Sequence, residues 1–316
     1  MVVDRIPASV VIPTRNRANV LRRTLESLAL QSSQPAQIIL VDASDDSATR
    51  SLCLEEPVSG LTTEVVWVAA SSVGAASQRN QGLLACRHAI VGFFDDDILF
   101  RADCVARLWG ALKSGPPLGG VSAMIENQRY QPPGTISRFM FRLMAGRSET
   151  SYAGRVLGPA VNLLPEDRED LPEVVQVEWL NTTCAMYRRE ALPDPPFPDH
   201  FTGYSMMEDV TLSLIVGRRW KLANARTARI FHDSQPGSHK SNVANLAKME
   251  LVNRHYVMTH VLSRSRWVDY WRLAIWELFQ VAVAAMSKEG LSSLHRILIG
   301  KASGLRFLIA ARNKSQ

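Results

Sequence analysis

Short apolar runs alternate with amphipathic segments along the first half of the chain. Runs rich in branched and aromatic residues have the length of buried strands, and they lie at 9–12, 38–41, 64–68 and 89–94. Between them, residues 20–28 show the apolar spacing of a helix, and we expect Asn16 or Asn19 to cap it. Residues 74–88 also look helical. Buried strands that alternate with helices predict an α/β fold, in which a mostly parallel sheet carries helices on both faces.

Polar residues follow the predicted strands directly. Thr14 comes just after the first strand, Asp42 ends the second, and three consecutive carboxylates at 95–97 end the fourth. Ligands of open α/β sheets bind beyond the carboxyl ends of the strands, so these side chains should line one crevice. Three like charges are costly to bury without partners, and such oxygen ligands suit Mg²⁺ or Mn²⁺, which often bind substrate phosphates as well. A solvated acidic turn without function is the competing interpretation.

The pattern is less regular after residue 125. Residues 126–172 contain a Pro-Pro-Gly sequence and an acidic run, and they fit either a lid inserted over the crevice or a plain surface loop. Strand-like runs return at 175–180, 183–187, 220–224 and 228–231. A helix is predicted over 206–214, with Glu208 and Asp209 in its first turn, where acidic side chains also complement the helix dipole.

Composition narrows the class of protein. The 316 residues are 46% hydrophobic and 21% charged, as in soluble globular proteins, and the formal net charge of +6 favours no single kind of anionic partner. The four cysteines form no C-x-x-C pair, which argues against a zinc knuckle or dithiol redox centre and is typical of a reducing cytoplasm. No signal peptide or spanning helix is evident, and the fingerprints of dinucleotide-binding and P-loop proteins are missing.

Five short segments occur in the order typical of one enzyme family, and together with His232 they cover about residues 8–233. They are VVIPTRNR at 10–17, ILVDAS at 39–44, QRNQG at 78–82, FFDDD at 93–97 and ED at 208–209. With these segments the chain resembles glycosyltransferase family 2, whose members are inverting transferases that use nucleotide-sugar donors and have the GT-A fold.

The resemblance implies a role for each matching position. For donor binding it implies Pro13, Thr14, Arg17, Asp42, Arg79, Asp95 and Asp96. For a divalent metal, Mn²⁺ or Mg²⁺, it implies Asp95, Asp97 and His232. Asp209 would be the general base, and further candidates for supporting or acceptor-binding residues are Glu208, Trp179 and Asn181. Structural alternatives stay open, with Asp42 as a turn cap, His232 as an ordinary hydrogen-bonded histidine and Trp179 as a core residue.

Two departures limit what the resemblance says about the substrates. The family often has Asp-Asp-Gly-Ser after the second strand, whereas this chain has Asp-Ala-Ser-Asp at 42–45, so the base of a UDP-, GDP- or dTDP-linked donor stays open. The Gln-x-x-Arg-Trp sequence of processive synthases is missing, and Arg-Arg-Trp at 218–220 is a partial match only. A single-addition transferase is favoured, with a glycan or a polyprenyl-linked acceptor.

Sugar transfer from a nucleoside diphosphate makes two chemical demands. Negative charge develops on the leaving diphosphate, which a bound cation stabilises. The acceptor hydroxyl loses its proton as it attacks, which calls for a carboxylate within hydrogen-bond reach. Separate acidic sites satisfy both demands, because a metal-bound carboxylate is a poor base, and one direct displacement inverts the anomeric centre.

Helices are predicted at 242–264 and 267–286 and again beyond Gly290. Their Trp and aliphatic residues alternate with Lys and Arg, as in helices that lie in a membrane interface. Packing on the catalytic domain or on a second subunit is an equally good interpretation. No chemistry is assigned to His239, His255 and His260.

We therefore expect a GT-A catalytic domain at 1–240, with a donor half at 1–125 and an acceptor half at 126–240, followed by a helical region at 241–316. The expected location is the cytoplasm, and peripheral attachment to the inner face of the cell membrane is one option. An anionic membrane surface and a homodimer stay open as partners, whereas no nucleic acid is expected.

Two other functions fit part of the pattern. A sugar-nucleotide pyrophosphorylase has the same fold, but such enzymes carry a Gly-rich loop after the first strand, where this chain has Pro-Thr-Arg-Asn-Arg. A non-catalytic basic module that binds anionic lipid or nucleic acid does not require carboxylates at the ends of successive strands. Metal-dependent release of a nucleoside diphosphate distinguishes the transferase from both.

Overall fold

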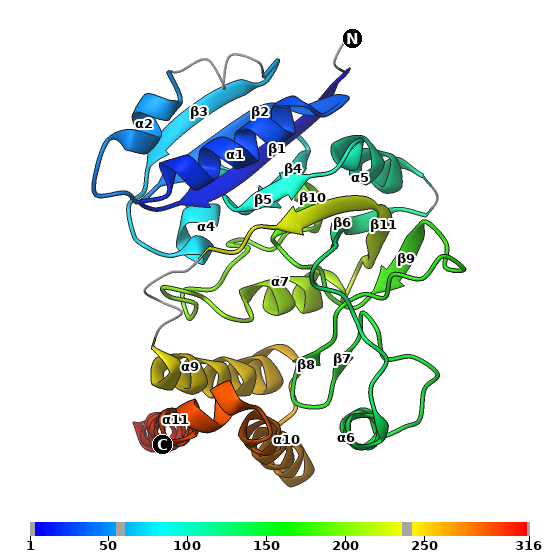
Figure 1. Ribbon diagram of the computed structural model, residues 1–316, viewed down its shortest axis with the longest axis vertical. Coiled ribbons are helices and arrows are strands. Elements are labelled where there is room, and N and C mark those ends of the chain that lie inside the picture. The colour runs from blue at the N-terminus through cyan, green and yellow to red at the C-terminus, as the bar shows by residue number, and fades with distance from the viewer. Residues whose placement is uncertain (1–3, 55–60, 115, 236–241, 315–316) are drawn as a thin grey trace. The chain divides into compact units, whose positions relative to one another are not determined.

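The computed structural model describes residues 4–54, 61–114, 116–235 and 242–314 (Figure 1). The chain divides into two compact units. Unit 1 consists of Met1–Gln131, Ala153–Arg155 and Leu164–Gln235, and unit 2 consists of Pro132–Tyr152, Val156–Leu163 and Pro236–Gln316. The sequence-based division at residue 240 differs from this one, because it assigned 132–152 and 156–163 to the catalytic domain. His239 lies outside the described residues.

Unit 1 is built on one mixed sheet, to which the described residues contribute nine strands. The strands are β1 (Asp4–Thr14), β2 (Ser33–Asp42), β3 (Glu64–Ala69), β4 (Ile90–Phe94), β5 (Ile98–Phe100), β6 (Leu118–Ile125), β9 (Val174–Val177), β10 (Cys184–Arg188) and β11 (Lys221–His232). Their order is β3-β2-β1-β4-β10-β6-β11-β5, and β9 pairs with β11. Only β5, β9 and β10 run against the other strands of the sheet. The predicted α/β fold with a mostly parallel sheet is confirmed.

Helices cover this sheet on both faces. They are α1 (Ala18–Ala29), α2 (Ala48–Leu52), α4 (Ala75–Ala85), α5 (Cys104–Lys113) and α7 (Glu208–Val216), with a short 3-10 turn η1 (Arg189–Ala191). Alternate residues of a strand point to opposite faces. Accordingly Val10 and Leu40 share a buried cluster with α1 and α5, whereas Val11 faces α4. The approach of α4 is so close that a Cβ on Gly82 would lie 2.3 Å from Cγ1 of Val11, which requires glycine there.

Three local predictions need correction. Neither Asn16 nor Asn19 caps α1, whose N-cap is Arg17 without a side-chain hydrogen bond. Asn16 instead has a positive φ of 53°, and its side chain donates to the Oδ2 atom of Asp45. The two short strands predicted at 220–224 and 228–231 are the single strand β11, whose register with β6 shifts between Ala225 and Arg229. The short strand β5, directly after the three carboxylates, was not predicted.

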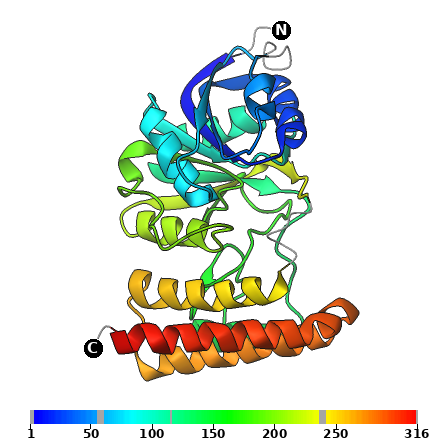
Figure 2. The same ribbon diagram turned by 90° about the vertical axis from the view of Figure 1, so that its left-hand side faces the viewer.

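Unit 2 contains the helix α6 (Thr135–Ala145), the hairpin strands β7 (Val156–Leu157) and β8 (Val161–Asn162), and the helices α9 (Val243–Tyr256), α10 (Trp267–Ala285) and α11 (Lys288–Lys314). A π-helical turn η2 (Val257–Val261) follows α9. The helices α9, α10 and α11 lie side by side (Figure 2), so the predicted C-terminal helical region is confirmed.

Part of the 126–172 region is a packed element of unit 2. Met140 and Met144 of α6 share a buried cluster with Leu157 of the β7–β8 hairpin and with Trp276 of α10. The interpretation as a plain surface loop is therefore wrong. Among the described residues, no helix is both long and apolar enough to cross a membrane.

Candidate active site

The three carboxylates form a tight turn between β4 and β5. The chain leaves β4, turns through residues 95–97 and enters β5, which pairs antiparallel with β11. In that register Ile98 lies opposite His232, the last residue of β11. The backbone N–H of Asp233 also donates to the carbonyl of Asp97 at 2.8 Å. Strand pairing thus places His232 beside the acidic turn, although 135 positions separate it from Asp97 in the sequence.

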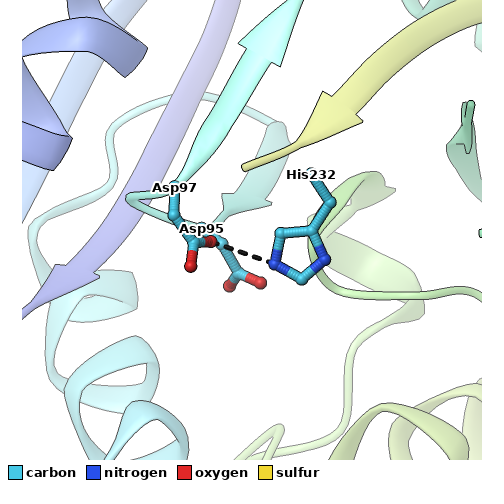
Figure 3. Close-up of side chains that lie close together, drawn as sticks. All are labelled: Asp95, Asp97 and His232. Carbon is cyan, nitrogen blue, oxygen red and sulfur yellow. Dashed lines mark hydrogen bonds and ion pairs between the residues drawn. The ribbon is translucent and has the colours of Figure 1, made fainter. Parts of the chain in front are cut away.

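Asp95, Asp97 and His232 form a cluster that can hold one metal ion (Figure 3). Each offers a ligand atom, and these atoms all lie within 4.8 Å of one another. Nε2 of His232 is 3.1 Å from Oδ1 of Asp97, and Gln128 holds the other ring nitrogen at 3.0 Å. Two carboxylates and one imidazole fit Mn²⁺ or Mg²⁺, and the contact with Gln128 orients the imidazole ring.

Asp96 points away from this cluster and into the protein. Its carboxylate accepts from Oγ1 of Thr14 at 2.7 Å and from Arg17 at 2.9 Å. Burial raises the pKa of Asp96 to about 6, although the charge of Arg17 and the Thr14 hydrogen bond act in the opposite direction. Arg17 also reaches Oδ2 of Asp97 at 3.3 Å. The geometry therefore favours a role for Asp96 in holding the turn, in contrast to the donor contact expected from the sequence.

Arg79 connects the acidic turn to the start of α7. Its guanidinium is buried and donates to Oδ1 of Asp95 at 2.6 Å and to Oε1 of Glu208 at 3.0 Å. The third guanidinium donor, Nε, has no hydrogen-bond partner within the part of the chain that the structure describes. One arginine thus fixes the distance between a metal-site carboxylate and the predicted general-base segment.

Glu208 and Asp209 lie in the first turn of α7, as predicted. Asp209 accepts from the backbone N–H of Val210 at 2.7 Å. Burial raises the pKa of Asp209 to about 6, while that N–H group and Arg79 oppose the shift. Burial, and after it the charge of Asp209, raises the pKa of Glu208 to about 8, against the effect of Arg79. A carboxylate whose pKa lies near neutral pH is suited to proton transfer.

A cavity of about 490 Å³ opens at the ends of β2 and β3, and Asp42, Arg50 and Trp67 are among its lining residues. Oδ1 of Asp42 accepts from the backbone N–H of Ser44 at 3.0 Å, and Oδ2 accepts from Nε1 of Trp67 at 3.1 Å. Two carboxylate oxygens have about four acceptor positions, so Asp42 retains capacity for a ligand N–H. The guanidinium of Arg50 lies over the Trp67 ring, 5.2 Å from its centroid.

The residues that line this cavity do not include the three carboxylates of the turn, which follow strand β4 at the same edge of the sheet. Thr14 lies between them: it pairs with Asp42 in the β1–β2 register and its side chain bonds to Asp96. Gln78 fixes this edge by donating to the carbonyls of Thr14 and Val41. Pro13 is buried within β1.

The predicted acceptor residues have other contacts. Trp179 is buried. The side-chain oxygen of Asn181 accepts from the backbone N–H of Thr183, whose carbonyl accepts from the N–H of Asp95 at 2.9 Å. Asn181 therefore supports the loop next to the acidic turn.

Sequence reasoning missed three residues that shape the site. Thr24 of α1 donates to the carbonyl of Asp96 and accepts from the N–H of Ile98, which braces the turn. Gln78 belongs to the QRNQG segment, but nothing in the neighbouring sequence indicates that its side chain donates to the carbonyls of Thr14 and Val41. Trp67 occupies a predicted strand, and only the β2–β3 register reveals that its indole reaches Asp42.

The fold and the acidic turn place the protein in the GT-A class of glycosyltransferase folds. The mannosyltransferase PcManGT from Pyrobaculum calidifontis, solved with GDP-Man and Mn²⁺, is similar over 95% of this chain and 87% of its own, with a TM-score of 0.57 and 15% identity. Residues 1–349 of S. aureus TarS, solved with UDP-GlcNAc, are similar over 98% and 93%, with a TM-score of 0.50 and 16% identity.

The chain belongs to glycosyl transferase family 2, which it matches over residues 9–194. The resemblance inferred from the motifs is thereby confirmed. A curated relative, the glycosyltransferase GlyA of Streptococcus pneumoniae serotype 4, is 28% identical over 109 residues. That alignment spans 34% of this chain and 15% of the relative's length.

Proposed function

We propose that this chain is an inverting, metal-dependent glycosyltransferase that moves a sugar from a nucleotide-sugar donor to a hydroxyl group. The observation that carries the proposal is the cluster of Asp95, Asp97 and His232 together with a separate carboxylate, Asp209, at the start of α7. The two groups of acids are held in relation to each other by Arg79.

The ligand atoms of this cluster fit a divalent cation, since they combine hard carboxylate oxygens with one oriented imidazole. When bound there, the cation would stabilise the negative charge of the leaving diphosphate as a Lewis acid. Arg17 adds a fixed positive charge beside Asp97. Because this guanidinium is held by Asp96, it is ordered before any ligand binds.

Asp209 is the group that we assign to proton transfer. Its raised pKa makes it a competent acceptor for the proton of an attacking hydroxyl near neutral pH. Glu208 is paired with Arg79 and is less available, so it supports the position of Asp209. Attack by the hydroxyl on the face opposite the leaving group inverts the anomeric carbon in one displacement.

The cavity at Asp42 suits the nucleobase of the donor. Asp42 can accept an N–H of uracil, thymine or guanine, and the paired Trp67 and Arg50 offer a flat surface for stacking. The complexes of similar proteins with GDP-Man and with UDP-GlcNAc are consistent with a nucleotide-sugar donor. A glycan or a polyprenyl-linked alcohol is the proposed acceptor class, and transfer of one sugar per binding event is the proposed mode.

A donor panel tests this proposal. The protein is incubated with UDP-, GDP- and dTDP-sugars and with glycan or polyprenyl-linked sugar acceptors, with Mn²⁺, Mg²⁺ or EDTA. We expect one nucleoside diphosphate to be released in the presence of metal and not in EDTA, and NMR of the product should show an inverted anomeric centre. Metal-independent release, or retention of configuration, would contradict the mechanism.

The Asp209→Asn variant isolates the base. It should bind donor in a thermal-shift assay with Mn²⁺ as the unaltered protein does, yet lose about 10²- to 10⁴-fold in transfer rate. Asp199→Asn, at an exposed position of the same unit, is the matched control and should leave the transfer rate unchanged. Normal turnover by the Asp209 variant would remove that residue from the mechanism.

A further inference from the structure

Helix α10 exposes apolar side chains to solvent and buries its acidic ones. Its exposed side chains include Trp267 at 78%, Trp271 at 49% and Leu278 at 69% of their full accessibility. These positions are spaced by 4 and 7 residues, so they fall on one face of the helix. Its two acidic residues, Asp269 and Glu277, are turned inward and are each 9% exposed. A helix on a water-facing surface has the opposite arrangement.

The inward acids have partners inside unit 2. Glu277 forms ion pairs with Arg254 at 3.3 Å and with Lys301 of α11. Asp269 accepts from the backbone N–H of Arg266 at 3.0 Å, at the start of α10. The acids therefore serve the packing of the helices, and the outer face of α10 is left without negative charge.

Helix α11 shows an apolar stripe with basic borders. Leu291, Leu298, Leu305 and Ile309 are exposed and recur at intervals of 7, 7 and 4 residues, which places them on one face. At 100° per residue, Lys288, Arg306 and Arg312 border this stripe, whereas the helix's single acidic residue, Glu289, falls on the far side.

Helix α6 repeats this composition on a smaller scale. Ile136 and Phe139 are 70% and 64% exposed. The helix also carries Arg138 and Arg142, and it has no acidic residue. Helices α6 and α11 thus combine exposed apolar side chains with basic ones, and α10 exposes apolar side chains beside them.

The charge of the chain is divided unequally between the two units. Unit 2 holds 15 of the 36 Lys and Arg residues but only 5 of the 30 Asp and Glu residues, which gives it a formal charge of +10 and leaves −4 for unit 1. The basic balance of the protein therefore comes from unit 2 alone. A partner for unit 2 should be anionic and should accept apolar side chains.

We propose that unit 2 docks on an anionic lipid bilayer, with the outer faces of α10 and α11 lying in the interfacial region. Trp and aliphatic side chains enter the boundary between headgroups and acyl chains, while bordering Lys and Arg attract anionic headgroups. A second copy of the chain fits less well, because it would bring two units of charge +10 together. This inference does not depend on the proposed transferase activity.

Vesicle flotation of the full chain tests the proposal. We expect co-flotation with phosphatidylcholine vesicles that contain about one third phosphatidylglycerol, much weaker co-flotation with phosphatidylcholine alone, and release at high salt. The emission of Trp267 and Trp271 should shift to shorter wavelength on binding and be quenched by lipids that carry a spin label on the acyl chain. The double variant Trp267→Ala/Trp271→Ala should lose both the flotation and the quenching.

Matched variants separate the contributions of charged and apolar side chains to vesicle binding. Arg306→Gln/Arg312→Gln should weaken binding to anionic vesicles by about fivefold per charge. The controls are Leu30→Ala and Arg87→Gln, which remove an exposed apolar and an exposed basic side chain from unit 1 and should leave flotation unchanged. Thermal melts confirm that each variant is folded.

Three outcomes would overturn the proposal. The first is the absence of co-flotation with anionic vesicles. The second is equal binding to neutral and anionic vesicles without salt dependence. The third is a concentration-dependent dimer in analytical ultracentrifugation that the Trp267→Ala/Trp271→Ala variant abolishes, without vesicle binding by the unaltered chain, since the apolar face would then be covered by a second copy.

Discussion

In unit 1 a large apolar core surrounds the sheet and the carboxylates of the candidate site lie at the ends of strands. In unit 2, by contrast, the helices turn aromatic and aliphatic side chains outward and bury the ion pairs of Glu277. Unit 1 has a formal charge of −4 and unit 2 one of +10. Both units follow the same physics, because a buried charge needs a partner and an exposed apolar face costs free energy unless something covers it. They differ in what they expose.

If both proposals hold, unit 1 carries the chemistry and unit 2 the attachment to a membrane. At the candidate site of unit 1 the polar groups are held by fixed partners, as Arg79 is held between Asp95 and Glu208. This is typical of sites that bind a small charged ligand. Unit 2 has no comparable convergence of acids in its described residues, and its ion pairs hold helices together.

The largest effect is expected for Asp97→Asn in unit 1. The change removes one negative charge from the cluster, beside Nε2 of His232, so we expect kcat/KM to fall by about 10³-fold and the apparent Mn²⁺ affinity to fall with it. Asp4→Asn, at an exposed position of the same sheet, is the control. Vesicle binding should stay unchanged, and a variant that kept full metal-dependent activity would exclude Asp97 as a ligand.

Arg254→Gln probes the buried charges of unit 2. Arg254 is buried, forms ion pairs with Glu250 at 3.0 Å and Glu277 at 3.3 Å, and donates to the carbonyl of Ala160 at 2.8 Å. Removing one partner of a buried pair costs about 3–5 kcal/mol. We expect a large loss of thermal stability, measured by calorimetry, while donor binding to the protein at low temperature persists. The exposed pair of Arg87 and Glu64 supplies the control, since Arg87→Gln should cost less than about 1 kcal/mol.

Gly300→Ala tests the close packing of α9 and α11. A Cβ on Gly300 would lie 2.2 Å from the carbonyl oxygen of Ala244, so the helices must move apart. We expect a loss of about 1–3 kcal/mol in the free energy of unfolding, measured with urea. Gly110→Ala in α5 is the matched control, because nothing lies within 4 Å of its Cβ position, and a gain of up to about 1 kcal/mol is expected there. Equal effects of the two changes would contradict the packing.

The sequence predicts the parts of unit 1 that depend on short-range pattern. The four strands before residue 95, the two longer helices between them, the acidic turn and the family could be predicted, because they depend on local apolar runs and on the polar residues that end or follow β1, β2 and β4. The short strand β5 was missed. Contacts between residues far apart in the sequence could not be predicted. The partnership of Trp67 with Asp42 depends on the β2–β3 register, and the brace of Thr24 on the turn joins segments 72 positions apart.

Unit 2 is harder to predict for a physical reason. The apolar and charged residues of α10 give the same amphipathic pattern whichever side is buried, so the sequence shows that Trp271 and Glu277 lie on different faces but not which face is inside. The contacts of Glu277 with Arg254 and Lys301 decide this. The contribution of 132–152 to the same unit depends on Met140, Met144 and Trp276 meeting in space, which no local pattern specifies.

A pH profile tests the base assigned in unit 1. Asp209 must be ionised to accept a proton, and its raised pKa means that it is protonated below about pH 6. We therefore expect kcat to fall about tenfold per pH unit below that point. Flotation on anionic vesicles should persist through the same range, because it depends on Lys and Arg. If kcat instead began to fall only near pH 4, close to the ordinary aspartate pKa of about 3.9, Asp209 would not be the titrating base.

Trp67→Phe is expected to have the smallest effect, and it asks whether the cavity of about 490 Å³ is the nucleotide site. Phenylalanine keeps a stacking face but cannot donate to Oδ2 of Asp42, as Nε1 of Trp67 does at 3.1 Å. One neutral hydrogen bond to a charged group contributes about 1.5–3 kcal/mol at most. Because that bond orients Asp42 and does not reach the reacting atoms, we expect KM for the donor to rise about three- to tenfold while kcat is unchanged. Trp109→Phe, in α5 and outside the lining of that cavity, is the control and should leave both constants unchanged. If the Trp67 variant instead lowered kcat at unaltered KM, the cavity would belong to the catalytic step, and the nucleobase would have to bind elsewhere on unit 1.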